Sequence, residues 1–132
     1  MIVVDTSIWV EAFSNQATPH VEVLSEMILN RREIFLTPTI LQETLQGIRN
    51  DDDFERLKYR FGGFPLLLPD AEEMAIQSAT LYRQLRKKGV TIRKSNDCLI
   101  AAYAIHHGAE VFHNDRDFDL ISQHSSLKIF KA

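Results

Sequence analysis

The chain opens with a short run of β-branched aliphatic residues, Ile2, Val3 and Val4, which ends at the acid Asp5. An apolar run without polar alternation is typical of a strand that is buried on both faces. Such strands occur almost only in parallel sheets whose two faces are covered by helices. The first five residues therefore favour an α/β fold.

Strand and helix patterns alternate along the rest of the chain. Further strand candidates are the short apolar runs at residues 33–36, 66–68, 111–112 and 127–130. Apolar periodicity and capping signals place helices between them, at residues 8–13, 19–32, 38–49, 51–61, 71–88 and 96–107, with a short one after Phe118. Ser95 is predicted to cap the sixth of these helices. The alternation predicts an α/β three-layer sandwich, in which helices flank a mainly parallel central sheet.

The composition fits one globular domain over residues 1–132. The chain is 45% hydrophobic and 25% charged, and about 100–200 residues usually form a single core. No run approaches the ~20 apolar residues of a bilayer span, and the N-terminus lacks a basic signal region. We therefore expect no membrane association and a cytoplasmic location. The single cysteine, Cys98, excludes an internal disulfide and a cysteine-based zinc site.

Four acids are placed where ligands bind in folds of this class. Asp5 and Asp115 each follow an apolar strand, and the carboxyl ends of parallel strands form the usual ligand-binding edge. Glu43 and Asp97 lie near the starts of two helices that can face the same edge. Two charges about 4 Å apart repel by roughly 4 kcal/mol at an effective dielectric constant of about 20, so converging carboxylates require protons or cations. Oxygen ligands alone favour Mg²⁺ or Mn²⁺, which suit phosphoryl chemistry.

Four sequence motifs resemble those of the PIN-domain nucleases, and among these the VapC toxins of toxin–antitoxin pairs. The motifs occur in the family's order and cover nearly the whole chain: Ile2–Ser7, Thr39–Glu43 with Gly47, Asn96–Ala102 and Asn114–Phe118. Each motif alone is weak, because an acid after an apolar run is common. The ordered set is specific.

The resemblance implies a function and a set of site residues. Family members cleave RNA, often structured RNA such as tRNA, with Mg²⁺ or Mn²⁺ as cofactor. They are usually homodimers that a cognate antitoxin protein holds inactive. The resemblance assigns metal binding to four acids and an auxiliary position at the edge of the site to a fifth: Asp5, Glu43, Asp97 and Asp115, with Asp117 as the auxiliary acid. His113 departs from the family, where many members have Thr, and its function is left open.

The predicted reaction is metal-dependent hydrolysis of an RNA phosphodiester bond by an activated water. Asp5 is expected to be the central ligand. Asp97 and Asp115 complete the coordination, and Glu43 holds the attacking water. Hydrogen bonds that support these acids are expected from three polar neighbours: Thr6, Ser7 and Asn114.

One basic segment is a candidate for binding the RNA backbone, although the net charge of −3 gives no overall attraction to nucleic acid. Residues 83–94 contain six cations and no acid. The cations at 83–88 also suit the C-terminal end of a helix dipole without any RNA. Arg93 and Lys94 lie beyond that helix and precede the Asp97 helix, so we predict that they bind RNA phosphates.

Each acid also has a simpler explanation as a helix cap, a turn residue or a surface carboxylate. A second candidate function is a degenerate PIN-like module that binds a partner protein and has no catalytic activity. The presence of all four acids argues against such decay. A haloacid-dehalogenase phosphatase is a further alternative, but it requires a second aspartate two residues after Asp5, where this chain has Ser7.

Overall fold

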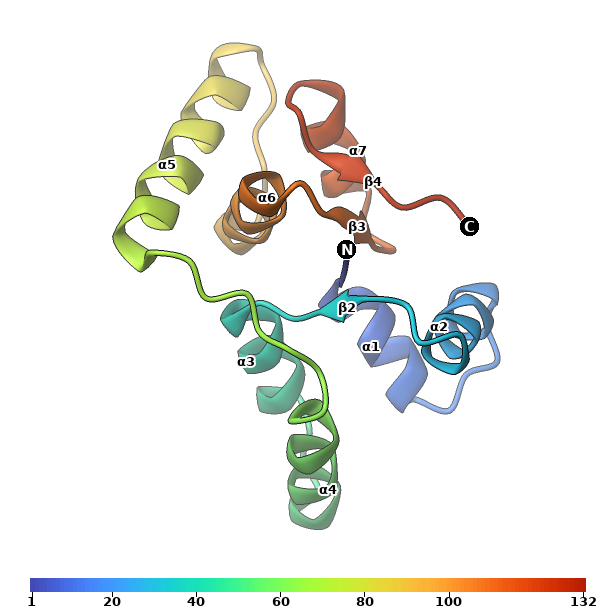
Figure 1. The fold of residues 1–132 in the computed structure, drawn as a ribbon. Coiled ribbons are helices and arrows are strands. Elements are labelled where there is room, and N and C mark those ends of the chain that lie inside the picture. Colours follow the sequence, from blue (N-terminus) through green and yellow to red (C-terminus); the bar gives the residue numbers. More distant parts are fainter.

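The computed structural model describes all 132 residues and contains one four-stranded sheet (Figure 1). The strands lie in the order β2-β1-β3-β4, and every neighbouring pair is parallel. Their bounds are Ile2–Val4 for β1, Ile34–Phe35 for β2, Glu110–Phe112 for β3 and Lys128–Ile129 for β4. The predicted α/β fold with a parallel sheet is confirmed.

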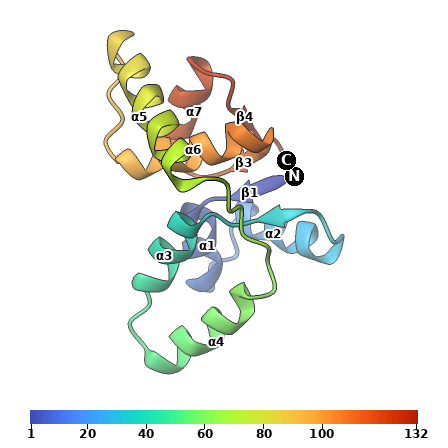
Figure 2. The ribbon, with the colours of Figure 1, turned by 60° about the vertical axis from the view of Figure 1, so that its left-hand side comes forward.

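Seven helices connect and cover the strands. They are α1 (Thr6–Phe13), α2 (Pro19–Leu29), α3 (Pro38–Gln46), α4 (Asp51–Phe61), α5 (Ala71–Lys87), α6 (Ser95–His107) and α7 (Arg116–Gln123). The helices α5, α6 and α7 lie on one side of the sheet and α1 and α2 on the other, which makes three layers (Figures 1 and 2). No helix combines the length and the apolar composition needed to cross a bilayer.

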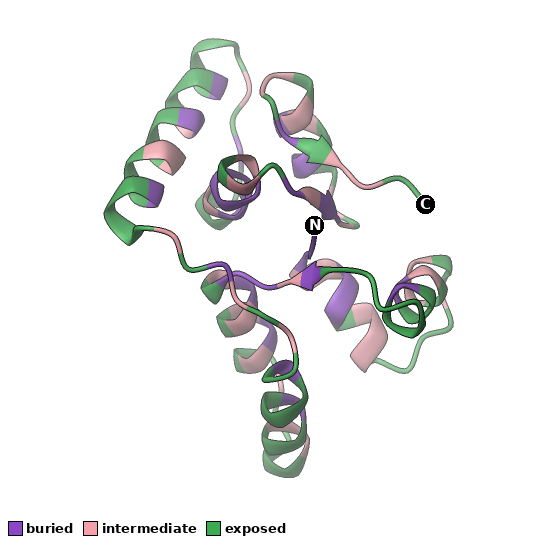
Figure 3. Ribbon diagram, in the orientation of Figure 1, coloured by how far each residue is buried: buried purple, intermediate pink, exposed green.

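The strand β1 is central in the sheet and is buried on both faces, as its composition predicts. Each of its three residues is at most 1% exposed. The helices turn their buried positions toward the interior, those of α5 toward α6, and their exposed positions toward solvent (Figure 3). One cluster of 27 buried residues includes Ile8 of α1, β1 itself and Phe118 of α7, so apolar packing joins the layers.

Two local predictions are wrong. Residues 66–68 do not form a strand, because only the first of them makes a parallel bridge, to Leu36. Prolines stand at both ends of this run, and a proline cannot donate a ladder hydrogen bond. Ser95 is not a cap either. Lys94 occupies the N-cap of α6 without a side-chain hydrogen bond, and Ser95 is the first helical residue.

The order of the strands reverses beside β1. From β1 the chain runs to β2 on one side and later returns to β3 on the other side. In open parallel sheets ligands bind beyond the carboxyl ends of the strands at such a switch point. Asp5 follows β1, Asp115 follows β3 by three residues, and the Asp5 N–H donates to the Phe112 carbonyl at 2.9 Å. The topology therefore brings two predicted acids to one edge.

Candidate metal centre

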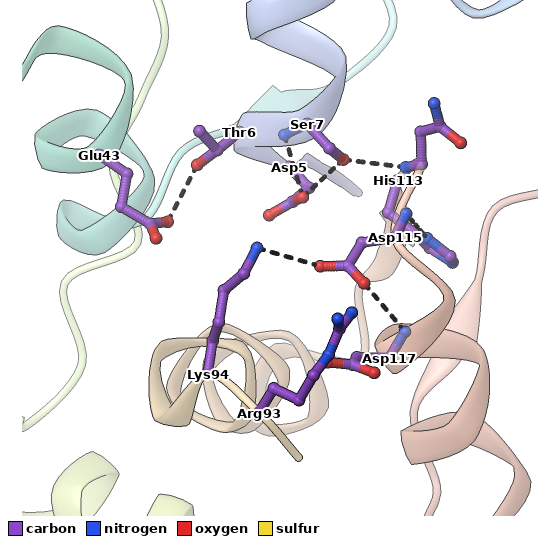
Figure 4. Close-up of polar contacts among 10 residues, drawn as sticks. Asp5, Thr6, Ser7, Glu43, Arg93, Lys94, His113, Asp115 and Asp117 are labelled. Atoms are coloured by element: carbon purple, nitrogen blue, oxygen red, sulfur yellow. Dashed lines mark hydrogen bonds and ion pairs between the residues drawn. The ribbon is translucent and has the colours of Figure 1, made fainter. Parts of the chain in front are cut away.

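Asp5 lies at the junction of β1 and α1 and is only 4% exposed. Its Oδ2 accepts hydrogen bonds from the Ser7 N–H at 3.1 Å and from the Ser7 hydroxyl at 2.7 Å, and so caps α1. The same hydroxyl accepts a hydrogen bond from the Asn114 N–H at 2.9 Å (Figure 4). The capping explanation of Asp5 is therefore correct, and through Ser7 the cap also connects the ends of β1 and β3.

Asp115 occupies the corresponding position between β3 and α7. Its Oδ1 accepts a hydrogen bond from the Asp117 N–H at 3.0 Å and caps α7, while its Oδ2 lies 3.6 Å from Lys94 Nζ. Asp117 is 3% exposed, and Arg93 Nε lies 3.7 Å from its Oδ2. Both cations that were predicted to bind RNA phosphates thus face acids of the site (Figure 4).

Three aspartates from two helices and their flanking loop converge. One carboxylate oxygen from each of Asp97, Asp115 and Asp117 lies within 4.8 Å of the other two. The sequence assigned Asp117 an auxiliary position at the edge, but the structure makes it a buried member of the cluster. Its spacing is a usable signal: Asp117 stands four residues before the fully buried Ile121, so both share the inward face of α7.

Burial and mutual repulsion perturb these acids in different directions. The pKa of Asp97 rises from 3.8 to about 7, first because burial disfavours the charged form and then because of the Asp115 and Asp5 carboxylates. Burial likewise raises the pKa of Asp5. Burial also acts to raise the pKa of Asp115, but the Asp117 N–H and the Lys94 ammonium outweigh it, and this pKa is lowered. Neighbouring acids with opposite shifts are characteristic of functional sites.

Glu43 approaches the site from α3. Its Oε1 accepts a hydrogen bond from the Thr6 hydroxyl at 3.0 Å, and its charge contributes to the raised pKa of Asp5. Glu43 is not part of the three-aspartate cluster. Figure 4 shows Glu43 and Thr6 on one side of Asp5 and the loop after β3 on the other. The fold thus brings acids from four separate parts of the sequence close enough to influence one another's pKa.

His113 is placed in the loop between β3 and Asp115. Its Nδ1 accepts a hydrogen bond from the Asp115 N–H at 3.0 Å, and its Nε2 lies 3.2 Å from Asp119 Oδ1. The sequence left the function of His113 open and did not single out Asp119. No spacing pattern identifies this contact, because it depends on the path of the loop after β3.

The donor set fits a hard divalent cation. Asp97 Oδ2 and Asp117 Oδ2 are buried oxygens without a hydrogen-bond partner. A buried carboxylate oxygen without a partner is costly, and a cation supplies one. Carboxylate oxygens are the ligands that Mg²⁺ and Mn²⁺ prefer. The neighbouring Cys98 is buried in the core, and burial raises its pKa to about 11, so it offers no thiolate.

A parallel sheet with acids gathered at its switch point matches a known nuclease domain. The family model of the PIN domain matches residues 2–123, and the chain belongs to this family. Among individual relatives, it is 38% identical to Ribonuclease VapC11 of Mycobacterium tuberculosis over 129 residues, which are 97% of this chain and 96% of the relative. The same figures hold for VapC ribonuclease Mb1587 of Mycobacterium bovis.

Solved structures of similar fold include two of VapBC proteins. The DNA-bound VapBC complex of Salmonella typhimurium has a TM-score of 0.77 at 18% identity, and covers 98% of this chain and 96% of that one. VapBC-1 of nontypeable Haemophilus influenzae has a TM-score of 0.76 at 19% identity, with 99% and 98% covered. At these identities the structures establish the fold alone, and they confirm the PIN-like architecture.

Proposed function

We propose that this chain is a metal-dependent endoribonuclease and the toxin of a type II toxin–antitoxin pair. The observation that carries the proposal is the convergence of the Asp97, Asp115 and Asp117 carboxylates at the switch point between β1 and β3. Two of their oxygens are buried and have no hydrogen-bond partner. The relatives at 38% identity are named ribonucleases, which supports RNA as the substrate. Structured RNA such as tRNA is the substrate class that we propose.

Asp5, Asp97 and Asp115 are the proposed ligands of Mg²⁺ or Mn²⁺, and Asp117 adds a carboxylate on the α7 side. Glu43 adds a further carboxylate on the α3 side of the site. The chemistry supplied by a bound divalent cation is Lewis-acid polarisation of the scissile phosphate and of the attacking water. With the cation present the carboxylates are ionised together, although Asp97 on its own holds a proton up to about pH 7.

The protein's own side chains orient the reactants. The Thr6 hydroxyl holds one carboxylate oxygen of Glu43, so the other oxygen is free to accept a proton from the attacking water and to direct it at phosphorus. On the opposite side Ser7 fixes both the Asp5 carboxylate and the Asn114 backbone. Hydrogen bonds of this kind hold ligands in a single orientation.

Arg93 and Lys94 are the proposed contacts to RNA phosphates. Their side chains are 72% and 63% exposed, and both reach the rim of the acidic site. The carboxylates of these pairs are largely buried, but both cations are exposed and lie 3.6–3.7 Å away, so an RNA phosphate can replace the carboxylates as partner once a cation neutralises the acids. Such contacts position the backbone beside the site without reading its sequence.

The proposed protein partner is a cognate antitoxin, and the same proposal includes a toxin homodimer that acts in the cytoplasm. A solved structure that shares the fold, from Klebsiella pneumoniae, is a toxin–antitoxin complex. An apolar groove of about 490 Å³ between α1, α2 and α4 offers a surface for such a partner, and its lining includes Trp9, Phe13, Ile28 and Phe61. Contiguous apolar surface of this kind marks protein interaction sites.

The second candidate function is a partner-binding module without catalysis, which the apolar groove also supports. The buried acids favour the nuclease. Burying mutually repelling carboxylates lowers stability, and the raised pKa of Asp97 is a measure of that cost. A module that only binds a partner through the groove has no use for such a cluster.

The test is cleavage of a bulk tRNA and rRNA mixture by the purified protein with Mg²⁺, with Mn²⁺ and with EDTA. The variant is Asp97→Asn, and the matched control is Asp52→Asn, an exposed aspartate on α4. We expect discrete fragments that require the metal. Residues that only support metal ligands typically contribute about 10- to 100-fold. Loss of the ligand Asp97 is therefore expected to exceed about 100-fold, while the control stays fully active.

Two outcomes would contradict the proposal. Equal cleavage by the wild type and by Asp97→Asn would assign the activity to a contaminating ribonuclease. No cleavage by the wild type, together with no Mn²⁺ binding by calorimetry, would favour the partner-binding module.

A further inference from the structure

The imidazole of His113 is held at both of its nitrogens, although it touches none of the proposed ligands' carboxylates. Its side chain is only 6% exposed and packs against Phe118, with ring centroids 5.2 Å apart. Nδ1 faces the backbone N–H of Asp115 at 3.0 Å, and Nε2 faces Asp119 Oδ1 at 3.2 Å. The ring therefore spans from the loop that carries a proposed ligand to the first turn of α7.

These contacts select one form of the ring. A backbone N–H can only donate, so Nδ1 must be an unprotonated acceptor. The proton of the neutral imidazole is then on Nε2, where the Asp119 carboxylate accepts it. The doubly protonated ring has no acceptor and loses the contact to the Asp115 N–H. One tautomer, with the proton on Nε2, satisfies both neighbours.

The contact between His113 and Asp115 resembles the hydrogen bond of an Asx turn. An Asn or Asp side chain often accepts a hydrogen bond from the N–H two residues later, and Ser or Thr forms a weaker version. Nδ1 of His113 takes the place of that side-chain oxygen. The turn fixes the backbone of Asp115, whose own carboxylate then caps α7 through Oδ1 and directs Oδ2 toward Lys94.

We propose that His113 is a positioning residue for Asp115: its Nδ1 holds the Asp115 N–H, and Asp119 holds the proton on the opposite nitrogen. His113 thereby sets the direction of the Asp115 carboxylate without touching metal or RNA. The consequence for metal binding rests on the proposed function, in which Asp115 is a ligand. The hydrogen-bond arrangement itself rests only on the geometry.

The first experiment reads the tautomer in the metal-free protein. Long-range ¹H–¹⁵N correlation spectra of the histidine rings are recorded, and the His113 signals are assigned by their loss in His113→Asn. We expect an unprotonated Nδ1 and a protonated Nε2, and we expect Asp119→Ala to shift the Nε2 resonance. A protonated Nδ1 would overturn the inference. The spectra need neither metal nor RNA, so their result is independent of the proposed function.

The second experiment compares two substitutions of the same residue. His113→Leu removes the acceptor, while His113→Asn retains an acceptor oxygen for the Asp115 N–H but cannot reach Asp119. We expect His113→Leu to weaken Mn²⁺ binding by about 10- to 100-fold, measured by calorimetry, and to slow RNA cleavage similarly. His113→Asn should recover at least half of that loss on a logarithmic scale. His106→Leu, at an exposed histidine in the last turn of α6, is the matched control.

The two outcomes separate positioning from simple structural support. Recovery in His113→Asn at the same urea midpoint as His113→Leu supports the positioning assignment. If His113→Asn binds Mn²⁺ as weakly as His113→Leu, or if both bind as well as the wild type, the assignment is wrong.

Discussion

The acidic site should make this protein less stable at neutral pH, and removing one charge should reverse the effect. The pKa of Asp97 is about 7 in the folded chain and 3.8 as the reference for an unfolded one. The folded state therefore binds this proton more tightly than the unfolded state. The contribution of Asp97 to the free energy of unfolding is therefore largest below about pH 4, and it falls as the pH rises toward 7.

The magnitude follows from the size of the shift. Each unit of pKa corresponds to about 1.4 kcal/mol, so the change from 3.8 to about 7 corresponds to a loss of up to about 4 kcal/mol above pH 7. The raised pKa of Asp5 acts in the same direction. Asp115 has a lowered pKa, so its contribution is present throughout the range from pH 5 to 8 and does not change within it.

Asp97→Asn isolates this effect because the amide keeps the shape of the protonated acid. At pH 5, which is already above the unfolded reference pKa of 3.8, we expect the variant to be more stable than the wild type by only about 1.7 kcal/mol. At pH 8 in EDTA the variant should be more stable by up to about 4 kcal/mol. Urea unfolding at both pH values measures the difference, and Asp52→Asn at an exposed position of α4 is the control.

Added Mn²⁺ should stabilise the wild type at pH 8 and have little effect on Asp97→Asn, since a ligand that binds only the folded state stabilises it. A wild-type stability that does not decline between pH 5 and 8 would refute the reasoning. So would a variant that is no more stable than the wild type at pH 8. A stable but inactive Asp97→Asn would also exclude misfolding as the reason for lost cleavage.

Two further substitutions test the support of the site and the partner surface. Ser7→Ala removes the hydroxyl that joins Asp5 to the Asn114 backbone. We expect about 10- to 100-fold weaker Mn²⁺ binding by calorimetry, and an unchanged affinity would contradict the role of Ser7. Ile28→Glu places a charge in the apolar groove at a 45% exposed position. It should weaken binding of the cognate antitoxin by about 2 kcal/mol, measured by calorimetry, and leave RNA cleavage by the free toxin unchanged. Full inhibition of the variant at the antitoxin concentration that just inhibits the wild type would exclude the groove as the binding surface.

Features that depend on local sequence were predictable. The β1 run, without a polar residue, was correctly predicted as a strand buried on both faces. Thr37 before a proline marked the start of α3, where its hydroxyl accepts from the Ile40 N–H. Asp70 similarly caps α5 through the Glu73 N–H. Such caps can be predicted because a cap and its partner are three residues apart, although the same reasoning was wrong for Ser95.

Features that depend on packing between distant segments were predicted less well. The run at 66–68 has strand-like composition, but its surroundings allow only a single bridge. Asp117 has the sequence of a turn acid, yet α7 packs so that its carboxylate is buried beside Asp97. The contact between His113 and Asp119 depends on the path of the loop after β3, and no spacing in the sequence predicts it.

By itself the sequence determined the α/β class, the approximate helices and the presence of acids just after β1 and β3, because these follow from residue types and short-range spacing. Only the tertiary structure decided which oxygens converge and which side chains orient them. The reason is the parallel pairing of β1 with β3, which brings the Ser7 hydroxyl to the Asn114 N–H across 107 residues of chain. No local pattern encodes an approach between segments so far apart, because it requires the complete sheet and its covering helices.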